Sequence, residues 1–345
     1  MYLSLIAFLL GWFITLLVCR YATSLKLVHR PNERSSHTKI TPHGGGLGII
    51  ASFFLISLWL MYLEEIYSPV YWGVIALCLL VALVGLVDDI IHLSATIRLI
   101  VHASVSLLVY LGISTLPLPA IEEILGLPFW LTVTLVIFAG SWWINLFNFM
   151  DGIDGLAASQ AIFMLLSAAF LSLYFNPIVL ETTVWLWMIC LAAATSGFLF
   201  HNWSPAKIFM GDVGSTFLAF MIFFFALITI SLGWMNYAAW VILSALFVID
   251  ASITLFRRIF ARENILQAHR SHLYQHLASY WSSHQKVTLL YLSVNLFWLF
   301  PLAYLCLTYR DASWWLLLIA YLPLSYLAYK FDAGKKTSYL YAFKK

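Results

Sequence analysis

Charged residues are scarce in this chain. Asp, Glu, Lys and Arg together make up 10% of the 345 residues, whereas hydrophobic residues make up 63% and the mean hydropathy is +0.93. A soluble chain of this length would usually hold two domains, but the composition overrides that prior. The scarcity of charge therefore excludes an ordinary soluble protein and indicates a membrane protein.

Cysteine is also rare, and the few cysteines form no recognisable pattern. None belongs to a Cys-x-x-Cys pair, and all four fall inside or at the ends of apolar runs: Cys19, Cys78, Cys190 and Cys306. We interpret them as packing residues, so that neither a disulfide framework nor a zinc site is implied. The first apolar run lacks a basic leader and a small-residue cleavage site, which favours a retained helix over a signal peptide. Repeats, low-complexity stretches and linkers are missing too, which predicts one membrane domain over residues 1–345.

Long apolar runs dominate what is present. A helix that crosses the hydrocarbon core needs about 20 mainly apolar residues. The runs are continuous rather than alternating, which indicates helices. We therefore predict an all-α integral membrane protein with about eleven transmembrane helices, over residues 1–22, 44–63, 70–87, 97–115, 128–147, 157–175, 184–201, 214–232, 238–256, 287–308 and 313–330.

The connecting loops differ in charge. If alternate loops share a side of the membrane, all of the 18 Lys and Arg except Arg310 lie on one side. Positive loops stay in the cytoplasm, so we predict an N-terminus outside and a cytoplasmic C-terminus. The net charge of +3 then reflects topology, and we expect a lipid bilayer rather than nucleic acid as partner. Nearly all polar chemistry falls on the cytoplasmic side, which places the candidate active site in the cytoplasmic loops.

The first polar loop ends in glycines. In the segment HRPNERSSHTKITPHGGGLGI, Gly44, Gly45 and Gly46 open an apolar run. Such glycines let backbone N–H groups approach an anion, helped by the dipole of the helix that follows. A plain basic loop whose glycines serve packing is an equal alternative.

A pair of carboxylates ends the third apolar run. Asp88 and Asp89 lie in the segment GLVDDIIHLSATIRL, followed by Arg98. Carboxylates are disfavoured beside a membrane and at the C-terminal end of a helix dipole. The placement indicates binding of a metal, a proton or a cation, with a solvated helix end as the alternative. Arg98 is placed to face a phosphate.

The segment NLFNFMDGIDG concentrates amides and carboxylates at the end of another run. Asn145, Asn148, Asp151 and Asp154 are spaced by three, and residues three apart lie near one face of a helix. We therefore expect all four to point to one side. A capped loop, with Asp154 as N-cap of the next helix, would explain one of them.

Two more segments complete the set. In HNWSPAKIFMGDVGS, Asp212 begins an apolar run as an N-cap or as a ligand for Mg²⁺, which takes one or two carboxylates, and Lys207 offers a cation for phosphate. In AHRSHLYQHL, the cluster of His269, Arg270 and His272 favours an anion clamp, because no thiol or His-Glu-x-x-His partner supports zinc. Carboxylates for Mg²⁺ and cations for a diphosphate are the two halves of a phosphoryl-transfer site.

These motifs carry a resemblance. The chain resembles the polyprenyl-phosphate N-acetylhexosamine-1-phosphate transferase family, in its O-antigen-initiating branch, through RSSHTKITPHGGG, VDD, NLFNFMDGIDGL, FMGDVGS and AHRSHLYQHL, which occur in family order. The resemblance implies an Mg²⁺-dependent enzyme, with Mn²⁺ as alternative ion, in the bacterial cytoplasmic (inner) membrane. It would transfer HexNAc 1-phosphate from a UDP-HexNAc donor (GlcNAc, or a deoxy relative such as FucNAc or QuiNAc) to undecaprenyl phosphate, with release of UMP. This is the first membrane step of O-antigen or cell-surface polysaccharide synthesis, and a homodimer is left open.

The resemblance also assigns roles to residues. It implies catalytic roles for Asp88, Asp89 and Asp151, and metal contacts for Asp212 and Asn148. It implies nucleotide or sugar binding by Asp154, Asn145, His269, Arg270 and His272, with Asp154 nearest the uracil. Phosphate binding is implied for Arg98, Lys207, Gly44 and Gly45. His43 departs from the family pattern, which more usually has Arg or Met before the glycines.

Other functions fit less well. A cation-coupled transporter is the main alternative, but its binding site would lie near the membrane midplane rather than at the cytoplasmic helix ends. The CDP-alcohol phosphotransferases require Ala-Arg after Asp-Gly and two later aspartates, which DGIDGLAASQ lacks. A scaffold or binding protein would leave five polar clusters on one side unexplained.

Overall fold

The fold is described from a computed structural model, in which residues 2–29, 41–63, 69–263 and 269–335 are placed. Helices make up nearly all of it: α1 (Tyr2–Tyr21), α2 (Gly46–Leu63), α3 (Pro69–Ile91), α4 (Ala95–Ser114), α5 (Ile121–Leu125), α6 (Phe129–Phe149), α7 (Leu156–Phe175), α8 (Thr183–Asn202), α9 (Asp212–Ser231), α10 (Tyr237–Leu243), α11 (Ala245–Phe260), α12 (Leu273–Trp281), α13 (His284–Val294), α14 (Phe300–Thr308) and α15 (Ser313–Lys330). A π-helical turn, Asn295–Leu299, joins α13 to α14, and short 3₁₀ turns cover Pro177–Glu181 and Arg310–Ala312. The two-residue strands β1 (Val28–His29) and β2 (Thr41–Pro42) pair antiparallel.

The all-α integral membrane fold predicted from the sequence is confirmed. Each of the eleven predicted apolar runs contains a helix. Within the described residues, nine helices are long and apolar enough to cross a membrane, and the bent pair of α10 and α11 makes a tenth. The remaining run is α2, a shorter apolar helix. The direction of insertion stays a prediction.

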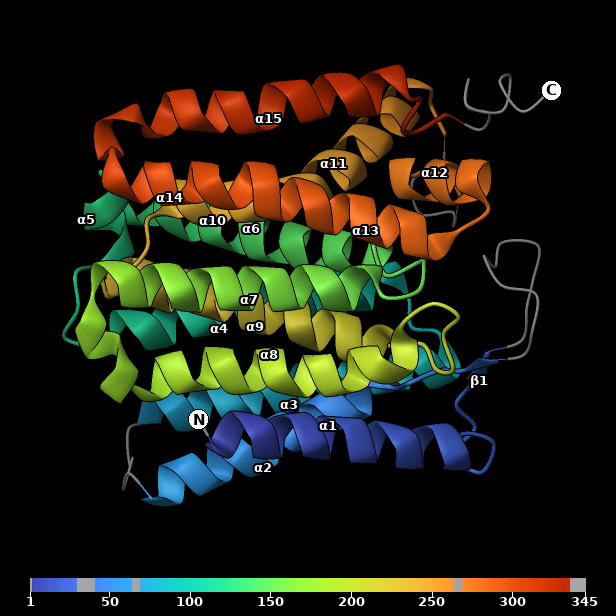
Figure 1. The fold of residues 1–345 in the computed structure, drawn as a ribbon. Helices are drawn as coiled ribbons and strands as arrows, with labels where there is room; N and C mark the ends of the chain where they lie inside the picture. The colour runs from blue at the N-terminus through green and yellow to red at the C-terminus, as the bar shows by residue number, and fades with distance from the viewer. Residues whose placement is uncertain (1, 30–40, 64–68, 264–268, 336–345) are drawn as a thin grey trace.

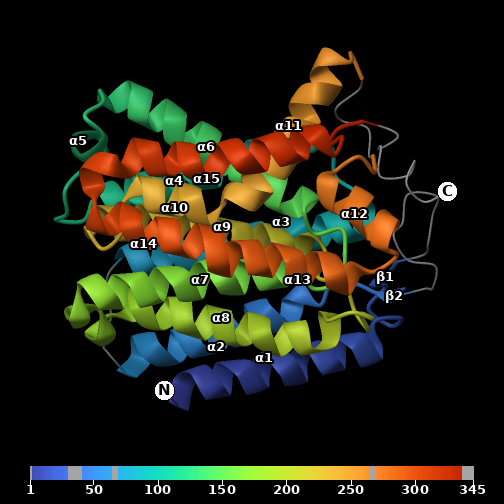
Figure 2. The ribbon, with the colours of Figure 1, turned by 45° about the horizontal axis from the view of Figure 1, so that its top comes forward.

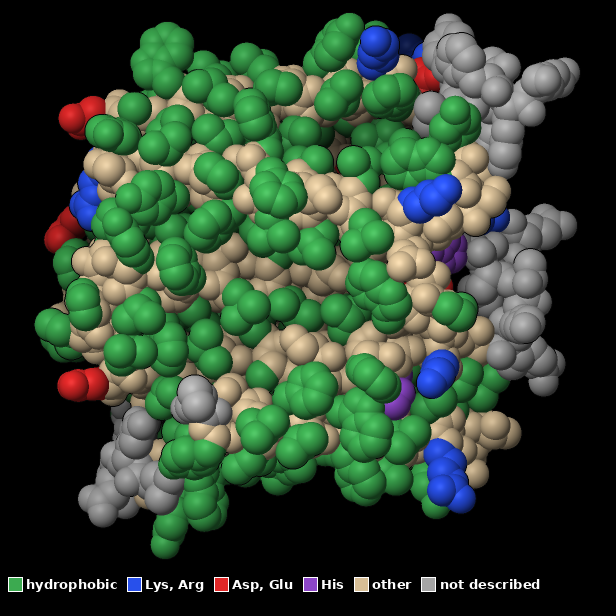
Figure 3. Space-filling model, in the orientation of Figure 1, with side chains coloured by type: hydrophobic (Ala, Val, Ile, Leu, Met, Phe, Trp, Pro, Cys, Tyr) green, Lys and Arg blue, Asp and Glu red, His purple; other side chains and the backbone are tan. Residues whose placement is uncertain are grey.

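The long helices lie side by side, so that their ends form two faces (Figure 1, and the tilted view of Figure 2). The centre of the bundle is α9, whose apolar window is 94% buried, whereas the outer helix α15 is 22% buried. A helix that is apolar on all sides belongs inside such a bundle or against lipid. In the space-filling view, apolar side chains cover the middle of the molecule (Figure 3). On this face most Lys and Arg gather where α1 and α15 end, and most Asp and Glu lie at the opposite end, as the loop charges predict.

The bend between α10 and α11 shows how the bundle tolerates broken helices. The two axes differ by 71°, which removes a helical partner from the carbonyl of Leu243. In the membrane such a group must be satisfied by a neighbour. The side-chain amide of Gln160 donates to it at 3.1 Å, and Asn295, which begins the π turn, donates in turn to Gln160 at 2.7 Å.

Candidate active site

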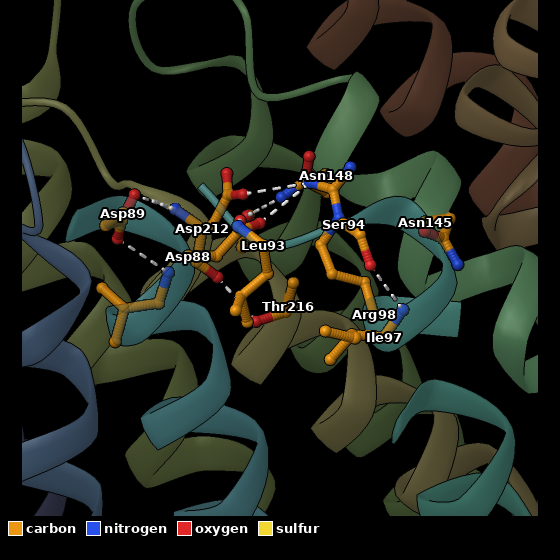
Figure 4. Close-up of polar contacts among 12 residues, drawn as sticks. Asp88, Asp89, Leu93, Ser94, Ile97, Arg98, Asn145, Asn148, Asp212 and Thr216 are labelled. Carbon is orange, nitrogen blue, oxygen red and sulfur yellow. Dashed lines mark hydrogen bonds and ion pairs between the residues drawn. The ribbon is translucent and has the colours of Figure 1, made fainter. Parts of the chain in front are cut away.

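Three charged side chains meet where α3 ends and α9 begins (Figure 4). Asp88 accepts the backbone N–H of Leu93 at 2.6 Å and Nη1 of Arg98 at 2.9 Å. The same Nη1 lies 3.5 Å from the carboxylate of Asp212. The carboxyl groups of Asp88 and Asp212 lie within hydrogen-bonding reach of each other. Two like charges this close cannot both ionise without a cation, and Arg98 supplies one here.

Local structure brings Arg98 to this point. The hydroxyl of Ser94 accepts the N–H of Ile97 at 3.3 Å and thereby caps α4. A cap fixes where the helix starts, and Arg98 stands in its first turn. The guanidinium uses only Nη1 for the carboxylates, and its buried Nε has no hydrogen-bond partner in the described part of the chain. Arg98 therefore keeps donor capacity for an anion.

Asp89 faces the other way, toward the backbone of α9. Its two carboxylate oxygens accept the N–H groups of Asp212 and Val213, at 2.9 and 3.1 Å. These are the first N–H groups of α9, which have no intrahelical partner. Gly211 has φ +78°, and a Cβ there would lie 2.7 Å from the Asp89 carboxylate. Asp89 therefore sets the position of Asp212. Nδ1 of His43 lies 3.7 Å from the carboxylate of Asp89.

Asn148 and Asp151 approach this cluster from the end of α6. The amide of Asn148 donates to Ser215 at 3.1 Å, and its side chain also hydrogen-bonds to Asp212. Asp151 is half-buried, and its carboxylate has no hydrogen-bond partner among the described residues. Removal from water and the negative charges of Asp212 and Asp89 raise the pKa of Asp151 well above its ordinary value.

The predicted common face of the NLFNFMDGIDG segment does not form. Asn145 hydrogen-bonds to His102 of α4 at 3.0 Å and points away from the Asp88 and Asp212 pair (Figure 4). Asp154 is buried and accepts the N–H of Ala206 at 3.2 Å, while its other oxygen lies 3.1 Å from His284. Helix α6 ends at Phe149, so the helical period stops before the two aspartates. Asp154 is not the N-cap of the next helix either, because Gly155 occupies that position.

Asp154 is ionised more easily than usual. Burial alone would raise the pKa of its carboxyl group, but the contact with His284 and the N–H of Ala206 outweigh it and lower the pKa below its ordinary value. Through Ala206 and His284, Asp154 therefore links the loop after α8 to the start of α13. Its role at the uracil stays a prediction.

The His269 to His272 loop forms a second centre. The rings of His269 and His272 stack with centroids 4.9 Å apart, and His269 also contacts the hydroxyl of Ser271 at 2.9 Å. Burial, together with the charge of His272, lowers the pKa of His269 to about 3. Arg270 lines a cavity of about 440 Å³ with Ser204, Pro205, Gln275, Ala278, Ser279, Ser282, Ser283, His284 and Gln285. That volume is typical of small-molecule sites.

The residues predicted to bind phosphate are only partly brought together. The N–H of Gly45 is donated to the carbonyl of Phe209 at 2.9 Å, whereas the N–H of Gly44 has no partner among the described residues. Lys207 is exposed and lies against α1, where its carbonyl accepts the thiol of Cys19 at 3.6 Å. No contact joins Lys207 to the aspartates in the described part of the chain, so the structure favours Arg98 over Lys207 beside the carboxylates.

Sequence reasoning missed Asp250 and Tyr274. Asp250 lies in α11 with 2% of its surface exposed, and Tyr274 lies in α12 with 1% exposed. A signal for Asp250 was present, because an ionisable residue inside an apolar run is a functional-site hypothesis by default. Tyr274 gave none.

The donor set fits a magnesium ion. Among the described residues, no group of three or more His, Cys, Asp or Glu is arranged to hold a metal alone. Mg²⁺ needs less, because it takes one or two carboxylates and completes its shell with water and substrate phosphate. Asp212, supported by Asn148 and adjoining Asp88, offers oxygen ligands of this kind.

Comparison with known proteins identifies the class. The model of Glycosyl transferase family 4 matches residues 71–230, which include Asp88 and Asp212. The chain is therefore similar to a class of membrane transferases. It is 30% identical over 331 residues to the decaprenyl-phosphate N-acetylglucosaminephosphotransferase of Mycobacterium leprae, covering 83% of this chain and 79% of that one.

Two further relatives agree. A probable undecaprenyl-phosphate N-acetylglucosaminyl 1-phosphate transferase of Bacillus subtilis is 28% identical over 293 residues, 81% of this chain and 77% of that one. A putative UDP-N-acetylglucosamine–dolichyl-phosphate N-acetylglucosaminephosphotransferase of Saccharolobus solfataricus is 33% identical over 232 residues, 63% of this chain and 67% of that one. The chain belongs to the polyprenyl-phosphate N-acetylhexosamine-1-phosphate transferase family.

Proposed function

We propose that the protein transfers N-acetylglucosamine 1-phosphate from UDP-GlcNAc to undecaprenyl phosphate. An oxygen of the lipid phosphate attacks the β-phosphorus of the donor, a new P–O bond forms, the bond to the α-phosphate breaks, and UMP leaves. The names of the three relatives support GlcNAc as the sugar, with a deoxy-HexNAc as the second candidate. We place the reaction in the bacterial inner membrane, as the first step of O-antigen or cell-surface polysaccharide synthesis.

One observation carries the proposal. Two carboxylates and an arginine meet at the end of a membrane bundle, where Arg98 lies 2.9 Å from Asp88 and 3.5 Å from Asp212. A lipid phosphate and a water-soluble nucleotide can both reach such a boundary. The transporter alternative predicts a site near the membrane midplane rather than at the helix ends, where Asp88, Arg98 and Asp212 meet.

We assign the roles of the carboxylates from their contacts. Asp212 and Asn148 would hold Mg²⁺, which would neutralise the charge that gathers on the phosphates. Asp89 is occupied by the backbone of α9 and positions Asp212. Asp88 is occupied by Leu93 and Arg98, so we assign the proton of the lipid phosphate to Asp151, whose carboxylate has no hydrogen-bond partner among the residues that the structure describes. Burial and the negative charges of Asp212 and Asp89 raise the pKa of Asp151, which strengthens its carboxylate as a base.

The cations complete the site. Arg98 would bind a phosphate with its Nε, which has no hydrogen-bond partner among the described residues, together with the N–H of Gly44. Arg270 and the cavity beside it would take part of the donor, and His269, which is stacked on the buried ring of His272, would contact the diphosphate and sugar. A homodimer is not needed for any of these contacts and stays a prediction.

A transfer assay tests the proposal. Purified protein receives undecaprenyl phosphate, Mg²⁺ and labelled UDP-GlcNAc, UDP-GalNAc or a deoxy-HexNAc donor, and lipid-linked product and UMP are measured. We expect equal amounts of both products from UDP-GlcNAc, loss with EDTA, recovery with Mg²⁺ or Mn²⁺, and a loss of about 100-fold or more in Asp212→Ala.

The matched control is Asp311→Ala, an exposed aspartate at the other end of the bundle, which should leave the activity unchanged. Transfer that survives both EDTA and Asp212→Ala would overturn the metal assignment. Ion flux into empty liposomes without any release of UMP would support the transporter instead.

A further inference from the structure

Asp250 is a buried carboxylate that the proposed reaction does not use. It lies in α11 and accepts the backbone N–H groups of Leu273 and Tyr274, at 2.8 and 3.0 Å. It also accepts the hydroxyl of Tyr291 at 2.8 Å, and Nδ1 of His272 lies 3.4 Å away. A buried charge is costly unless it is paired and hydrogen-bonded, so its environment is built around it.

The partners of Asp250 define where α12 begins. Leu273 and Tyr274 are the first two residues of α12, and His272 is its N-cap. The first N–H groups of a helix have no intrahelical partner and favour a negative charge. The carboxylate of a membrane helix therefore fixes the start of α12, and with it the stacked pair of His269 and His272.

Tyr274 connects the start of α12 to the end of α6, which is the other half of the site. Its hydroxyl donates to the carbonyl of Phe149 at 3.0 Å, at the last residue of α6 and just ahead of Asp151. Gly152 packs against the same hydroxyl so closely that a Cβ at this position would collide with it. The ring of Tyr274 also stacks on that of His272, with centroids 5.6 Å apart.

We propose that Asp250 and Tyr274 are positioning residues, which hold the donor-binding loop of His269 and His272 in fixed register with Asn148 and Asp151. The proposal rests on the proposed function, because it assigns the loop to the UDP-sugar. The two halves of the site come from segments more than a hundred residues apart, and the path from Asp250 through Tyr274 to Phe149 links them by hydrogen bonds. Displacing catalytic groups by about 1 Å can cost 100-fold in rate.

The arrangement predicts a specific kinetic change. If Asp250 is lost, α12 starts less precisely and the loop binds the donor poorly, while the acceptor contacts of Arg98 remain. In Asp250→Ala and Tyr274→Phe we expect KM for UDP-GlcNAc to rise about tenfold or more, and KM for undecaprenyl phosphate to change less than about twofold. Asp250→Asn keeps one acceptor oxygen, so its effect should lie between those of the wild type and Asp250→Ala.

Hydrogen–deuterium exchange of the full-length protein provides a readout that does not depend on activity. Amides of residues 273 and 274 should exchange faster in both Asp250 variants, because their acceptor is removed or halved. Tyr274→Phe should speed exchange in residues 150–155 and leave α1 unchanged. If Asp250→Ala does not fold, Asp250→Asn and Tyr274→Phe test the same proposal.

The matched control is Tyr321→Phe. The hydroxyl of Tyr321 donates to the carbonyl of Val241 at 2.9 Å, a bond of the same kind between α15 and α10. It should leave both KM values unchanged. The proposal is overturned if the Asp250 and Tyr274 variants exchange like the wild type, or if they change both KM values equally, as a general loss of stability would. If the wild type makes no lipid-linked product, the proposed function fails, and the exchange measurement still decides the coupling.

Discussion

Asp89 holds the backbone of Asp212, with one carboxylate oxygen 2.9 Å from the N–H of that residue and the other 3.1 Å from the N–H of Val213. Asp89 thus stabilises the start of α9, which is the most buried of the membrane helices among the described residues. The carboxylate of Asp151, although close by, makes no such hydrogen bond within the described ranges of the chain. The two aspartates should therefore respond oppositely to substitution.

Asp89→Ala should destabilise the protein. It removes the cap of α9 and leaves two buried N–H groups without an acceptor, which costs about 1–3 kcal/mol. The thermal midpoint of the purified protein in detergent should fall, and transfer should fall with it because Asp212 is no longer held. A variant with wild-type midpoint but no activity would show instead that Asp89 acts directly in the reaction.

Asp151→Asn should abolish most transfer without loss of stability. Burial and the charges of Asp212 and Asp89 raise the pKa of Asp151, so the ionised carboxylate is disfavoured in the folded protein. Replacing it removes repulsion, and we expect a thermal midpoint equal to or above that of the wild type. Rates and midpoints measured side by side with Asp89→Ala check this contrast. A lower midpoint in Asp151→Asn would mean that the carboxylate stabilises the fold.

Arg98→Ala should make stability depend more strongly on Mg²⁺ than it does in the wild type. Without the guanidinium, the carboxyl groups of Asp88 and Asp212 face each other uncompensated, which costs about 1–3 kcal/mol. Saturating Mg²⁺ should recover much of this loss, because a ligand that binds only the folded state stabilises it. Thermal midpoints with EDTA and with Mg²⁺ measure the effect. Exposed Arg262→Ala is the control and should show the same Mg²⁺ response as the wild type.

The sequence predicted the helices well because each apolar run is long enough to be a helix by itself. The runs ending at Asp88 and beginning at Asp212 also placed these two carboxylates at helix ends, and helix ends of a membrane bundle meet at its faces. Their convergence with Arg98 follows from that geometry and from the cap at Ser94.

The rest depended on contacts between distant segments. Asn145 and Asp154 share a spacing with Asn148, but the period applies only while the helix continues, and α6 ends at Phe149. Asp154 instead meets His284, which is 130 residues away. Asp250 was missed because its partners Leu273 and Tyr291 lie in helices that follow a separate loop, and nothing in the apolar run around Asp250 indicates what the carboxylate binds.

Gly152→Ala should disturb the contact that joins the segment of Asn148 and Asp151 to Tyr274 and the histidine loop. The added methyl group would collide with the hydroxyl of Tyr274, which is fixed by its bond to Phe149 and has 1% of its surface exposed. We expect a stability loss of about 1–3 kcal/mol and a fall in transfer of about tenfold or more. Adding Tyr274→Phe removes the obstructing oxygen and should recover part of the stability, as thermal midpoints of the double variant would show. Gly73→Ala is the control, because a Cβ there meets nothing within 4 Å.

Asp154→Asn should change how stability depends on acid. Burial would raise the pKa of Asp154, but His284 and the N–H of Ala206 lower it below its ordinary value near 3.9. A carboxyl group with a lowered folded-state pKa contributes stability that is present above the unfolded pKa and lost as the pH falls through the folded pKa.

Asp154→Asn should therefore lower the free energy of unfolding at pH 7 by about 1 kcal/mol, and the thermal midpoint should fall with it. The difference from the wild type should shrink as the pH falls below the ordinary pKa of an aspartate toward the lowered pKa of folded Asp154, where the wild-type carboxyl group protonates. Midpoints of both proteins between pH 7 and pH 3 measure this convergence, with exposed Asp311→Asn as a variant that should follow the wild type throughout. A constant gap between Asp154→Asn and the wild type over the whole range would mean that the ionised carboxylate does not brace the loop against α13.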